Sequence, residues 1–352
     1  MADWKDGLIK IAPYVAGEQP KRADLIKLNA NENPYPPSPR VIEAIHGFDG
    51  ADLRRYPNAD ALPLMEAIAE DLGTEPKNVF VGNGSDDVLA LCFRAFFGTD
   101  RPVLFPDITY SFYPVWCRMY GIPFETIPVD EKFDIDTDDY ERPNGGVVIA
   151  NPNAPTSIGR DLEFMRRILD ENPDSVVISD EAYVDFGGHT ALPLLKDYEN
   201  LIVVRTFSKS RSMAGSRIGF AVGGDVLITA LRTAKDSYNS YPLDSVAIAA
   251  GCASLSDKQY FEDTIAKVKA TRERTAAALR GMGFVIPDSS TNFLFAHHDG
   301  YRAEDIYKYL MDQGIYVRYF RSPERIADHL RITIGTDEQM DAMIAALKVY
   351  IG

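Results

Sequence analysis

The strongest constraint on the fold is an alternation of apolar and amphipathic segments that begins near residue 78. Short segments rich in Val, Ile and Leu alternate with segments such as 85–97, in which apolar residues recur at helical spacing. Strands that are apolar throughout are buried on both faces, so helices must cover both sides of the sheet. The pattern therefore predicts an α/β fold with a mostly parallel sheet. The segments predicted as strands are 78–82, 101–106, 123–129, 145–152, 175–183 and 200–208.

The two ends of the chain follow other patterns. Four prolines in 31–40 predict an extended arm, because proline lacks an amide hydrogen and restricts the residue before it. Beyond about residue 245, a long helical segment (257–281) precedes strands and helices that indicate a smaller α+β domain, with which we expect the arm to pack. The predicted divisions are an N-terminal arm (1–45), a large domain (46–245) and a small C-terminal domain (246–352).

Two helix starts carry capping signals. Ser85 precedes two acidic residues and an apolar helical face, and it is predicted to be an N-cap residue. Thr336 is predicted to cap the last helix, with Asp337 and Glu338 in the first turn. Carboxylates at that position interact favourably with the helix dipole.

Charge and cysteine content exclude several classes of function. The net charge of −15 for 352 residues argues against a nucleic-acid or anionic membrane surface, since both require a basic footprint. The three cysteines lie far apart and the five histidines form no metal-binding pair, so no metal site is predicted. The chain shows no basic-then-apolar leader, and no apolar run approaches the roughly 20 residues that span a bilayer. We therefore expect a cytoplasmic protein.

Polar residues gather where the predicted strands end, which is where ligands bind in such folds. One strand runs into the glycine turn 81–87, whose backbone amides can face an anion. Another ends at Asp180, with Tyr183 three residues later, and the next is followed by Lys209 and Arg217. A lysine in a partly dry, cationic setting loses its proton readily and forms Schiff bases with carbonyls. Together, a phosphate turn, an acid, a phenol and a lysine predict a pyridoxal phosphate site.

Several sequence motifs follow one another along nearly the whole chain. They are KLNANENPYPPSP (27–39), RRYPN (54–58), GNGSDDVL (82–89), NPNAPTS (151–157), SDEAYVDF (179–186), RTFSKSRSMAGSRIGFAVG (205–223), TNFLF (291–295) and LRITIGT (330–336). In this order they resemble the motifs of fold-type I pyridoxal-phosphate-dependent aminotransferases, and most closely those of the histidinol-phosphate aminotransferase family. The resemblance implies a large α/β domain that binds pyridoxal 5'-phosphate, a smaller α+β domain and a homodimer.

The resemblance also implies a role for each matching residue of the cofactor site. Lys209 would carry the cofactor as a Schiff base and move the proton, Asp180 would pair with the pyridinium nitrogen, and Tyr183 would hydrogen-bond the phenolate oxygen. Tyr56 resembles the residue that reaches the cofactor phosphate of the other subunit. The residues expected around the phosphate and the ring are Ser85, Asp86, Tyr110, Thr206, Ser208 and Arg217.

One motif departs from the family pattern. The usual sequence NPNNPTG reads NPNAPTS here, so the asparagine that contacts the phenolate oxygen is replaced by Ala154, and Ser157 replaces the glycine. Two readings stay open: Asn153 takes over that contact after a small loop shift, or Tyr183 acts alone.

The reaction implied by the resemblance is transamination of L-histidinol phosphate with 2-oxoglutarate, a step of histidine biosynthesis with ping-pong kinetics. Arg331 would bind the α-carboxylate of glutamate, and Arg318 would bind the substrate phosphate. Other residues that resemble pocket-lining positions are Tyr14, Asn31 and Asn292. Arg321 and Arg325 lie near Arg318 in sequence, and either of them could assist it or be solvated.

Two other activities stay open on the same scaffold. One is an aminotransferase for aromatic or other amino acids, and the other is a lyase similar to threonine-phosphate decarboxylase. A cofactor-binding regulator without turnover is disfavoured, because the chain has no DNA-binding extension or basic stretch.

Overall fold

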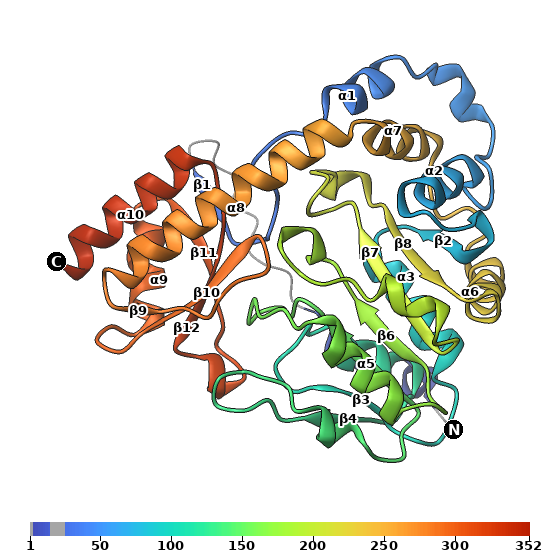
Figure 1. Ribbon diagram of the computed structural model, residues 1–352, viewed down its shortest axis with the longest axis horizontal. Coiled ribbons are helices and arrows are strands. Elements are labelled where there is room, and N and C mark those ends of the chain that lie inside the picture. Colours follow the sequence, from blue (N-terminus) through green and yellow to red (C-terminus); the bar gives the residue numbers. More distant parts are fainter. Residues whose placement is uncertain (1–2, 15–24) are drawn as a thin grey trace.

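The computed structural model describes residues 3–14 and 25–352, which form two β-sheets with helices packed around them (Figure 1). The larger sheet consists of segments between residues 79 and 223, and the smaller one combines C-terminal strands with a strand from the N-terminal arm. Short 3-10 helices lie at Trp4–Gly7, Gly50–Arg54, Pro76–Asn78, Thr137–Tyr140, Val184–Phe186, Leu192–Lys196, Ala214–Ser216 and Glu324–Ile326.

The larger sheet has seven strands in the order β2-β8-β7-β6-β5-β3-β4. Strands β3 to β7 pair in parallel, whereas β8 runs antiparallel to both β2 and β7. The prediction of a mostly parallel sheet is confirmed. Strand β8 was not predicted, because its five residues begin and end with glycine, which weakens a strand pattern. The strands are β2 (Val79–Gly82), β3 (Val103–Pro106), β4 (Phe124–Ile127), β5 (Gly146–Ala150), β6 (Val177–Asp180), β7 (Leu201–Thr206) and β8 (Gly219–Gly223).

Both faces of this sheet are buried, as the continuous apolar strands predict. Along β5, Val148 packs with α3, α4 and α6 on one face, whereas Val147 and Ile149 pack with α5 on the other. All three side chains have no exposed surface. Helix α2 covers the edge formed by β2 and β8. The helices are α2 (Leu62–Leu72), α3 (Ser85–Phe96), α4 (Tyr113–Tyr120), α5 (Leu162–Glu171) and α6 (Asp225–Tyr238).

The smaller sheet has five strands in the order β1-β11-β12-β10-β9. Strand β1 comes from the proline-rich arm and pairs in parallel with β11, while the other strands pair antiparallel. Helices α8, α9 and α10 pack against this sheet (Figure 1). The elements are β1 (Ile26–Leu28), α8 (Lys258–Arg280), β9 (Phe284–Val285), β10 (Phe293–His298), α9 (Ala303–Asp312), β11 (Ile315–Tyr319), β12 (His329–Thr333) and α10 (Asp337–Ile351).

Helices α1 (Pro39–His46) and α7 (Ser245–Ser256) pack together beside α2, and α8 continues from α7 toward the smaller sheet (Figure 1). The cap predicted at Thr336 is confirmed, because its side chain accepts a hydrogen bond from the Gln339 amide in a capping box. The cap predicted at Ser85 is wrong. Gly84 occupies the N-cap position with φ of 87°, a conformation that glycine adopts without strain, and α3 therefore begins at Ser85 itself.

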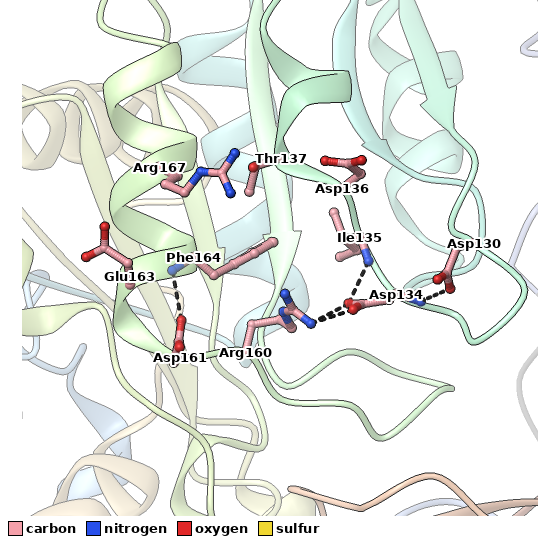
Figure 2. Close-up of a pocket in the computed structure, with 10 residues that line it drawn as sticks. All are labelled: Asp130, Asp134, Ile135, Asp136, Thr137, Arg160, Asp161, Glu163, Phe164 and Arg167. Atoms are coloured by element: carbon pink, nitrogen blue, oxygen red, sulfur yellow. Dashed lines mark hydrogen bonds and ion pairs between the residues drawn. The ribbon is translucent and has the colours of Figure 1, made fainter.

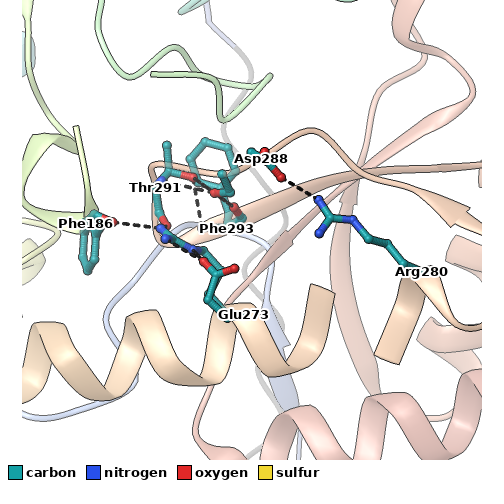
Figure 3. A network of polar contacts seen from close by, with 8 residues as sticks. Phe186, Glu273, Arg280, Asp288, Thr291 and Phe293 are labelled. Carbon is teal, nitrogen blue, oxygen red and sulfur yellow. Dashed lines mark hydrogen bonds and ion pairs between the residues drawn. The ribbon is translucent and has the colours of Figure 1, made fainter. Parts of the chain in front are cut away.

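A buried arginine of α8 joins the two sheets. Arg272 is 6% exposed, and it donates hydrogen bonds of 2.8 Å to the carbonyl oxygens of Phe186 and Thr291. Figure 3 shows Phe186, Thr291 and Glu273 gathered at this contact, and Glu273 accepts a hydrogen bond from the same guanidinium. Phe186 closes the turn that carries Tyr183, and Thr291 precedes β10. Arg272 therefore holds the segment after β6 against the smaller sheet.

Replacing Arg272 should destabilise the protein. The Arg272→Met variant keeps an apolar stem but leaves two buried carbonyls unpaired, and we expect the free energy of unfolding in urea to fall by about 2–4 kcal/mol. Arg280→Met on the same helix is the control: Arg280 is 43% exposed and also contacts a carbonyl and a carboxylate, so its loss should cost less than about 1 kcal/mol. Equal losses would contradict a bridging role for Arg272.

Candidate active site

The site lies where the neighbouring strands β6 and β7 end. The two strands pair in parallel with Asp180 beside Val204, so the segments that follow them emerge at the same edge of the sheet. Asp180 is the last residue of β6, and Lys209 follows β7 by three residues. Tyr183 reaches the same space, and the Nζ atom of Lys209 lies 5.8 Å from the centre of the Tyr183 ring.

Asp180 is a buried carboxylate without a cationic side chain beside it among the described residues. The Tyr113 hydroxyl donates to Oδ2 at 2.7 Å, and the amide of Ala182 donates to Oδ1 at 3.3 Å. Burial raises the pKa of the Asp180 carboxyl to about 6, although these hydrogen bonds favour its ionised form. A protonated pyridine nitrogen would supply the missing charge. The sequence did not predict this contact of Tyr113, because in the sequence Tyr113 is one of several apolar and aromatic residues of a helical segment.

Hydrogen-bond donors gather at the start of α3. We call this group, made of Ser208, Arg217 and the backbone amides that follow Gly84, the donor cradle. The Nη1 atom of Arg217 lies 3.5 Å from the Ser208 hydroxyl, and its Nη2 atom lies 3.4 Å from an oxygen of Asp86. Thr206 accepts from the amide of Ser208 at 3.0 Å and shapes the turn. No side chain caps the first turn of α3, so the amides that follow Gly84 are directed toward this cradle.

Glycine is required at Gly84 and Gly219 of this cradle. A Cβ atom at Gly84 would lie 2.5 Å from Nη2 of Arg217, and one at Gly219 would lie 2.2 Å from the amide nitrogen of Ser85. At these two positions the backbone lies so close to its neighbours that no side chain would fit. Amide, hydroxyl and guanidinium donors so arranged fit a phosphate group.

An acidic side chain also enters the cradle. The Tyr110 hydroxyl donates to Oδ1 of Asp86 at 2.7 Å, and the other carboxylate oxygen faces Arg217. Burial and the carboxylate of Asp86 raise the pKa of Tyr110 above its ordinary range, so Tyr110 stays a hydrogen-bond donor. The structure thus brings together residues from three separate segments of the sequence, namely Ser85, Asp86, Tyr110, Thr206, Ser208 and Arg217.

Asn153 is fully engaged within the protein. Its side-chain oxygen accepts from the Thr109 hydroxyl at 2.7 Å, and its Nδ2 atom donates to the Ile108 carbonyl at 2.9 Å and the Thr156 hydroxyl at 3.0 Å. Both amide hydrogens therefore have protein acceptors, and the residue is 3% exposed. These bonds connect the loop of Asn153 to the segment after β3. The neighbouring residue, Ala154, has no side-chain donor.

Two arginines line the side of the site formed by the smaller sheet. Arg318 and Arg331 are opposite each other on β11 and β12, and both guanidinium groups lie within 6 Å of the Phe320 ring centre. Burial lowers the pKa of Arg331, and the like charge of Arg318 acts in the same direction. Arg331 donates to the Asn29 carbonyl at 2.9 Å, while its buried Nε atom has no partner among the described residues. Such a pair favours anionic ligands.

The other residues predicted near the pocket differ in their surroundings. Asn31 donates to the Tyr183 hydroxyl at 2.8 Å, and Asn292 donates to the Asn31 carbonyl at 3.0 Å. Tyr14 stacks on Phe112 with 4.1 Å between the ring centres. Arg321 is exposed.

Arg325 is 39% exposed, and its guanidinium is bonded to acceptors on other loops. It donates to a carboxylate oxygen of Asp107 at 2.7 Å and to the carbonyls of Val129 and Asp130 at 2.8 and 2.9 Å. These three acceptors belong to the loops that follow β3 and β4, so Arg325 fastens the segment before β12 to the larger sheet.

Tyr56 lies on the surface, 81% exposed, and stacks on Tyr241 with 4.7 Å between the ring centres. Within this chain the described structure shows no contact between Tyr56 and Arg217 or Ser208. An exposed aromatic pair of this kind is available to a second molecule.

A separate open pocket lies between the loop after β4 and helix α5 (Figure 2). It has a volume of about 420 Å³ and is lined by Asp130, Asp134, Ile135, Asp136, Thr137, Arg160, Asp161, Glu163, Phe164 and Arg167. Figure 2 shows Arg160 pointing at Asp134, to which it donates at 2.6 Å. Its two arginines form ion pairs with acids, whereas Arg318 forms none with the part of the chain that the structure describes.

Neither a metal site nor a membrane helix appears in the described part of the chain. Across residues 3–14 and 25–352, no three His, Cys, Asp or Glu side chains are grouped to hold a metal ion. The described helices include none that is long and apolar enough to cross a bilayer.

The chain is similar to known aminotransferases both in sequence and in overall fold. Residues 23–347 match the family model of aminotransferase class I and II. The chain is 52% identical over 351 residues to a histidinol-phosphate aminotransferase of Acinetobacter baumannii, covering 99% of this chain and 97% of that protein. It is also 52% identical over 345 residues to histidinol-phosphate aminotransferase 2 of Thiobacillus denitrificans, covering 98% and 97%. A histidinol-phosphate aminotransferase from Sinorhizobium meliloti, solved with pyridoxal-5'-phosphate, has a TM-score of 0.83 at 25% identity, covering 93% and 90%.

The buried Asp180 should make the stability of the cofactor-free protein depend on pH. Its pKa in the folded chain, about 6, is above the ordinary value of 3.8, so ionisation disfavours the folded state. The free energy of unfolding should therefore fall as pH rises from about 4 to about 6, by at most about 3 kcal/mol.

Urea titrations at several pH values check this expectation. Asp180→Asn should remove the fall, whereas Asp174→Asn, at an exposed position, should keep it. A wild-type stability that rises through this range relative to Asp180→Asn would contradict the assignment.

Proposed function

The chain belongs to the aminotransferase class I and II family, whose members depend on pyridoxal phosphate, and we propose that it transfers the amino group of L-histidinol phosphate to 2-oxoglutarate. The observation that carries the choice of substrate is the pair Arg318 and Arg331, in register on adjacent strands. The similarity of 52% to histidinol-phosphate aminotransferases over 99% of the chain supports it. We propose that the enzyme acts in histidine biosynthesis in the cytoplasm.

The residues present fit pyridoxal phosphate. The cofactor, when bound, supplies an aldehyde that condenses with amines and a ring that accepts electrons. Asp180 is buried and lacks a cation, so it suits the ring nitrogen, and it would keep that nitrogen protonated. Ser208, Arg217 and the amides at the start of α3 would hold the phosphate. Tyr183 would donate to the ring oxygen.

Lys209 is the group that we propose to move the proton. Its amine would take a proton from the substrate Cα and deliver it at the cofactor's reactive carbon. Lys209 suits this task because it forms no ion pair with the described residues. Asn33 holds the backbone of Lys209 and of the next residue, with Nδ2 at 3.1 Å from the Lys209 carbonyl and 3.3 Å from the Ser210 carbonyl. Ser210 in turn donates to Asp185 at 2.6 Å. These contacts limit the motion of the lysine backbone, so its side chain alone exchanges between partners.

The two arginines explain how one pocket accepts two different anions. Glutamate brings carboxylates, and histidinol phosphate brings a phosphate instead of an α-carboxylate. Arg331 is partly exposed, but its Nε atom is buried without a partner among the described residues, which suits a carboxylate held by two hydrogen bonds. Arg318 is partly exposed and would meet the phosphate at the mouth of the pocket. Asn292, whose buried Oδ1 atom has no partner among the described residues, would face the substrate.

We also propose a homodimer in which Tyr56 reaches the phosphate of the partner's cofactor. The support is its exposure of 81% and its stacking on Tyr241, which hold the ring outward from the chain. Tyr14 would complete the pocket beside Phe112.

Covalent attachment at Lys209 should be detectable directly. Borohydride treatment of the holoenzyme should fix the cofactor to a peptide containing Lys209, as read by mass spectrometry. Lys209→Ala should lose this product and slow the half-reaction with amino donor by roughly 10²–10⁴-fold or more. Lys235→Ala is a control far from the site, bonded to Asp60 and Ala59, and should retain the modified Lys209 peptide. Label at another lysine would contradict the assignment.

Substrate choice is tested by comparing kcat/KM for histidinol phosphate, phenylalanine and other amino donors. We expect histidinol phosphate to be preferred, and Arg318→Ala to lower its kcat/KM by roughly 10- to 150-fold, as for the loss of a charge-assisted hydrogen bond. The loss for phenylalanine should be smaller, since its carboxylate meets Arg331. Arg321→Ala, at the exposed position three residues on, is the matched control. Equal losses for both donors, or a better donor than histidinol phosphate, would overturn the proposal.

A further inference from the structure

We propose that Asn31 is a positioning residue that turns the phenolic proton of Tyr183 toward the cofactor. This role takes the place of the asparagine that the chain lacks at Ala154. The inference rests on the proposed cofactor site and goes beyond it. Its starting point is a hydrogen bond of 2.8 Å from Nδ2 of Asn31 to the Tyr183 hydroxyl, across 152 residues of sequence.

A tyrosine hydroxyl has one proton and can accept hydrogen bonds, and the proton turns to suit its neighbours. In this protein the amide of Asn31 supplies a donor to the Tyr183 oxygen. The proton of Tyr183 must then point to a different acceptor. Asn31 thus makes the phenol a donor toward the open side of the site, where the cofactor's ring oxygen is expected.

The neighbouring threonine decides which end of the amide faces the phenol. The hydroxyl of Thr333 accepts from the backbone amide of Asn31 at 3.0 Å, so its own proton needs an acceptor. That acceptor is Oδ1 of Asn31, at 3.2 Å. With Oδ1 directed at Thr333, the NH₂ group is left to face Tyr183.

The arrangement is held rigidly. Asn31 is 2% exposed and has φ of 55°, in the left-handed region that asparagine tolerates better than most residues. Its carbonyl accepts from Nδ2 of Asn292 at 3.0 Å. The ring of Tyr183 packs edge-on against Phe293, with 5.1 Å between the ring centres. Neither partner of the 2.8 Å bond is therefore free to turn away.

The direction of the proton matters because neither Ala154 nor Asn153 offers a second side-chain donor. Ala154 has no polar side chain, and both amide hydrogens of Asn153 are directed to Ile108 and Thr156. Tyr183 is thus the donor that can stabilise negative charge on the cofactor's ring oxygen. Lys209 lies against the same phenol ring, so the donor also influences the proton held at its Nζ atom.

The test is a pH titration of the visible absorption of the holoenzyme. The Asn31→Gly variant removes the side-chain amide. Glycine is chosen because it adopts the φ of 55° at this position without strain. We expect the pH midpoint of the absorption change to lie about 0.4–1 pH unit higher than in the wild type, as for the loss of one aligned hydrogen bond. Asn31→Asp keeps the shape and the backbone conformation but replaces the donor with an acceptor. The carboxylate would attract the phenolic proton, so its shift should be at least as large.

Tyr183→Phe separates this inference from the proposed function. Tyr183→Phe should raise the midpoint, and Asn31→Gly in that background should add nothing further. Asn200→Ala, which removes an amide bonded to the Asn172 and Ser175 carbonyls at the opposite end of the sheet, should titrate like the wild type.

Each outcome has a distinct meaning. If Tyr183→Phe shifts the midpoint while Asn31→Gly and Asn31→Asp do not, the positioning role is wrong. It is equally wrong if Asn31→Gly shifts the midpoint as much without the phenol as with it. If Tyr183→Phe causes no shift, the proposed contact of Tyr183 with the cofactor fails. If Asn31→Gly does not fold, Asn31→Asp alone decides, because it retains the bond to Thr333.

Discussion

The parallel pairing of β6 with β7 is the constraint on which the site depends. It places the end of a buried strand, with its carboxylate, beside the start of the loop that carries Lys209. Removing the Asp180 carboxylate from water is costly, and two hydrogen bonds offset only part of that cost. The sheet stays folded despite this desolvation cost, because apolar residues packed on both of its faces hold its strands in register. A ring with a protonated nitrogen would compensate the same charge, which is why we propose that Asp180 pairs with the nitrogen of the cofactor ring.

The second constraint is the contact between the two sheets. Arg272 holds the turn after β6 against the segment before β10, and Asn31 holds the phenol of that same turn against β12. Arg325 ties the opposite side to the loops after β3 and β4. These contacts run through backbone carbonyls as well as side chains, so the site depends on how the two sheets dock. The arginines proposed to bind the substrate belong to one sheet, and the proposed catalytic lysine and acid lie at or just after the ends of strands of the other, so the proposed chemistry requires this docking.

Much of this could be predicted from local patterns, and the failures have physical causes. Continuous apolar strands and helical periodicity identified six strands of the larger sheet, but not β8, whose terminal glycines hide its strand character. Ser85 resembled a cap, yet the backbone of Gly84 could take the required conformation and displaced it by one position. The partners of Asn153 could not be predicted from local patterns, because Thr109 and Ile108 lie 44 and 45 positions earlier in the sequence. Arg325 illustrates the same difficulty, since its acceptors lie about 200 residues earlier.

The sequence by itself determined which residue types stand at the ends of the core strands: an acid, a phenol, a lysine and an arginine within short motifs. Those identities are local, and they suffice to indicate the chemistry. Only the tertiary structure decided which donor faces which acceptor. A side-chain amide or hydroxyl has several ways to satisfy its hydrogen bonds, and the choice depends on partners that folding brings from 44 to 302 positions away, as for Asn153 and Asn31. Tyr183 is therefore readable from its motif, but the direction of its proton is set by Asn31 and Thr333, which reach it only when the arm pairs with the smaller sheet.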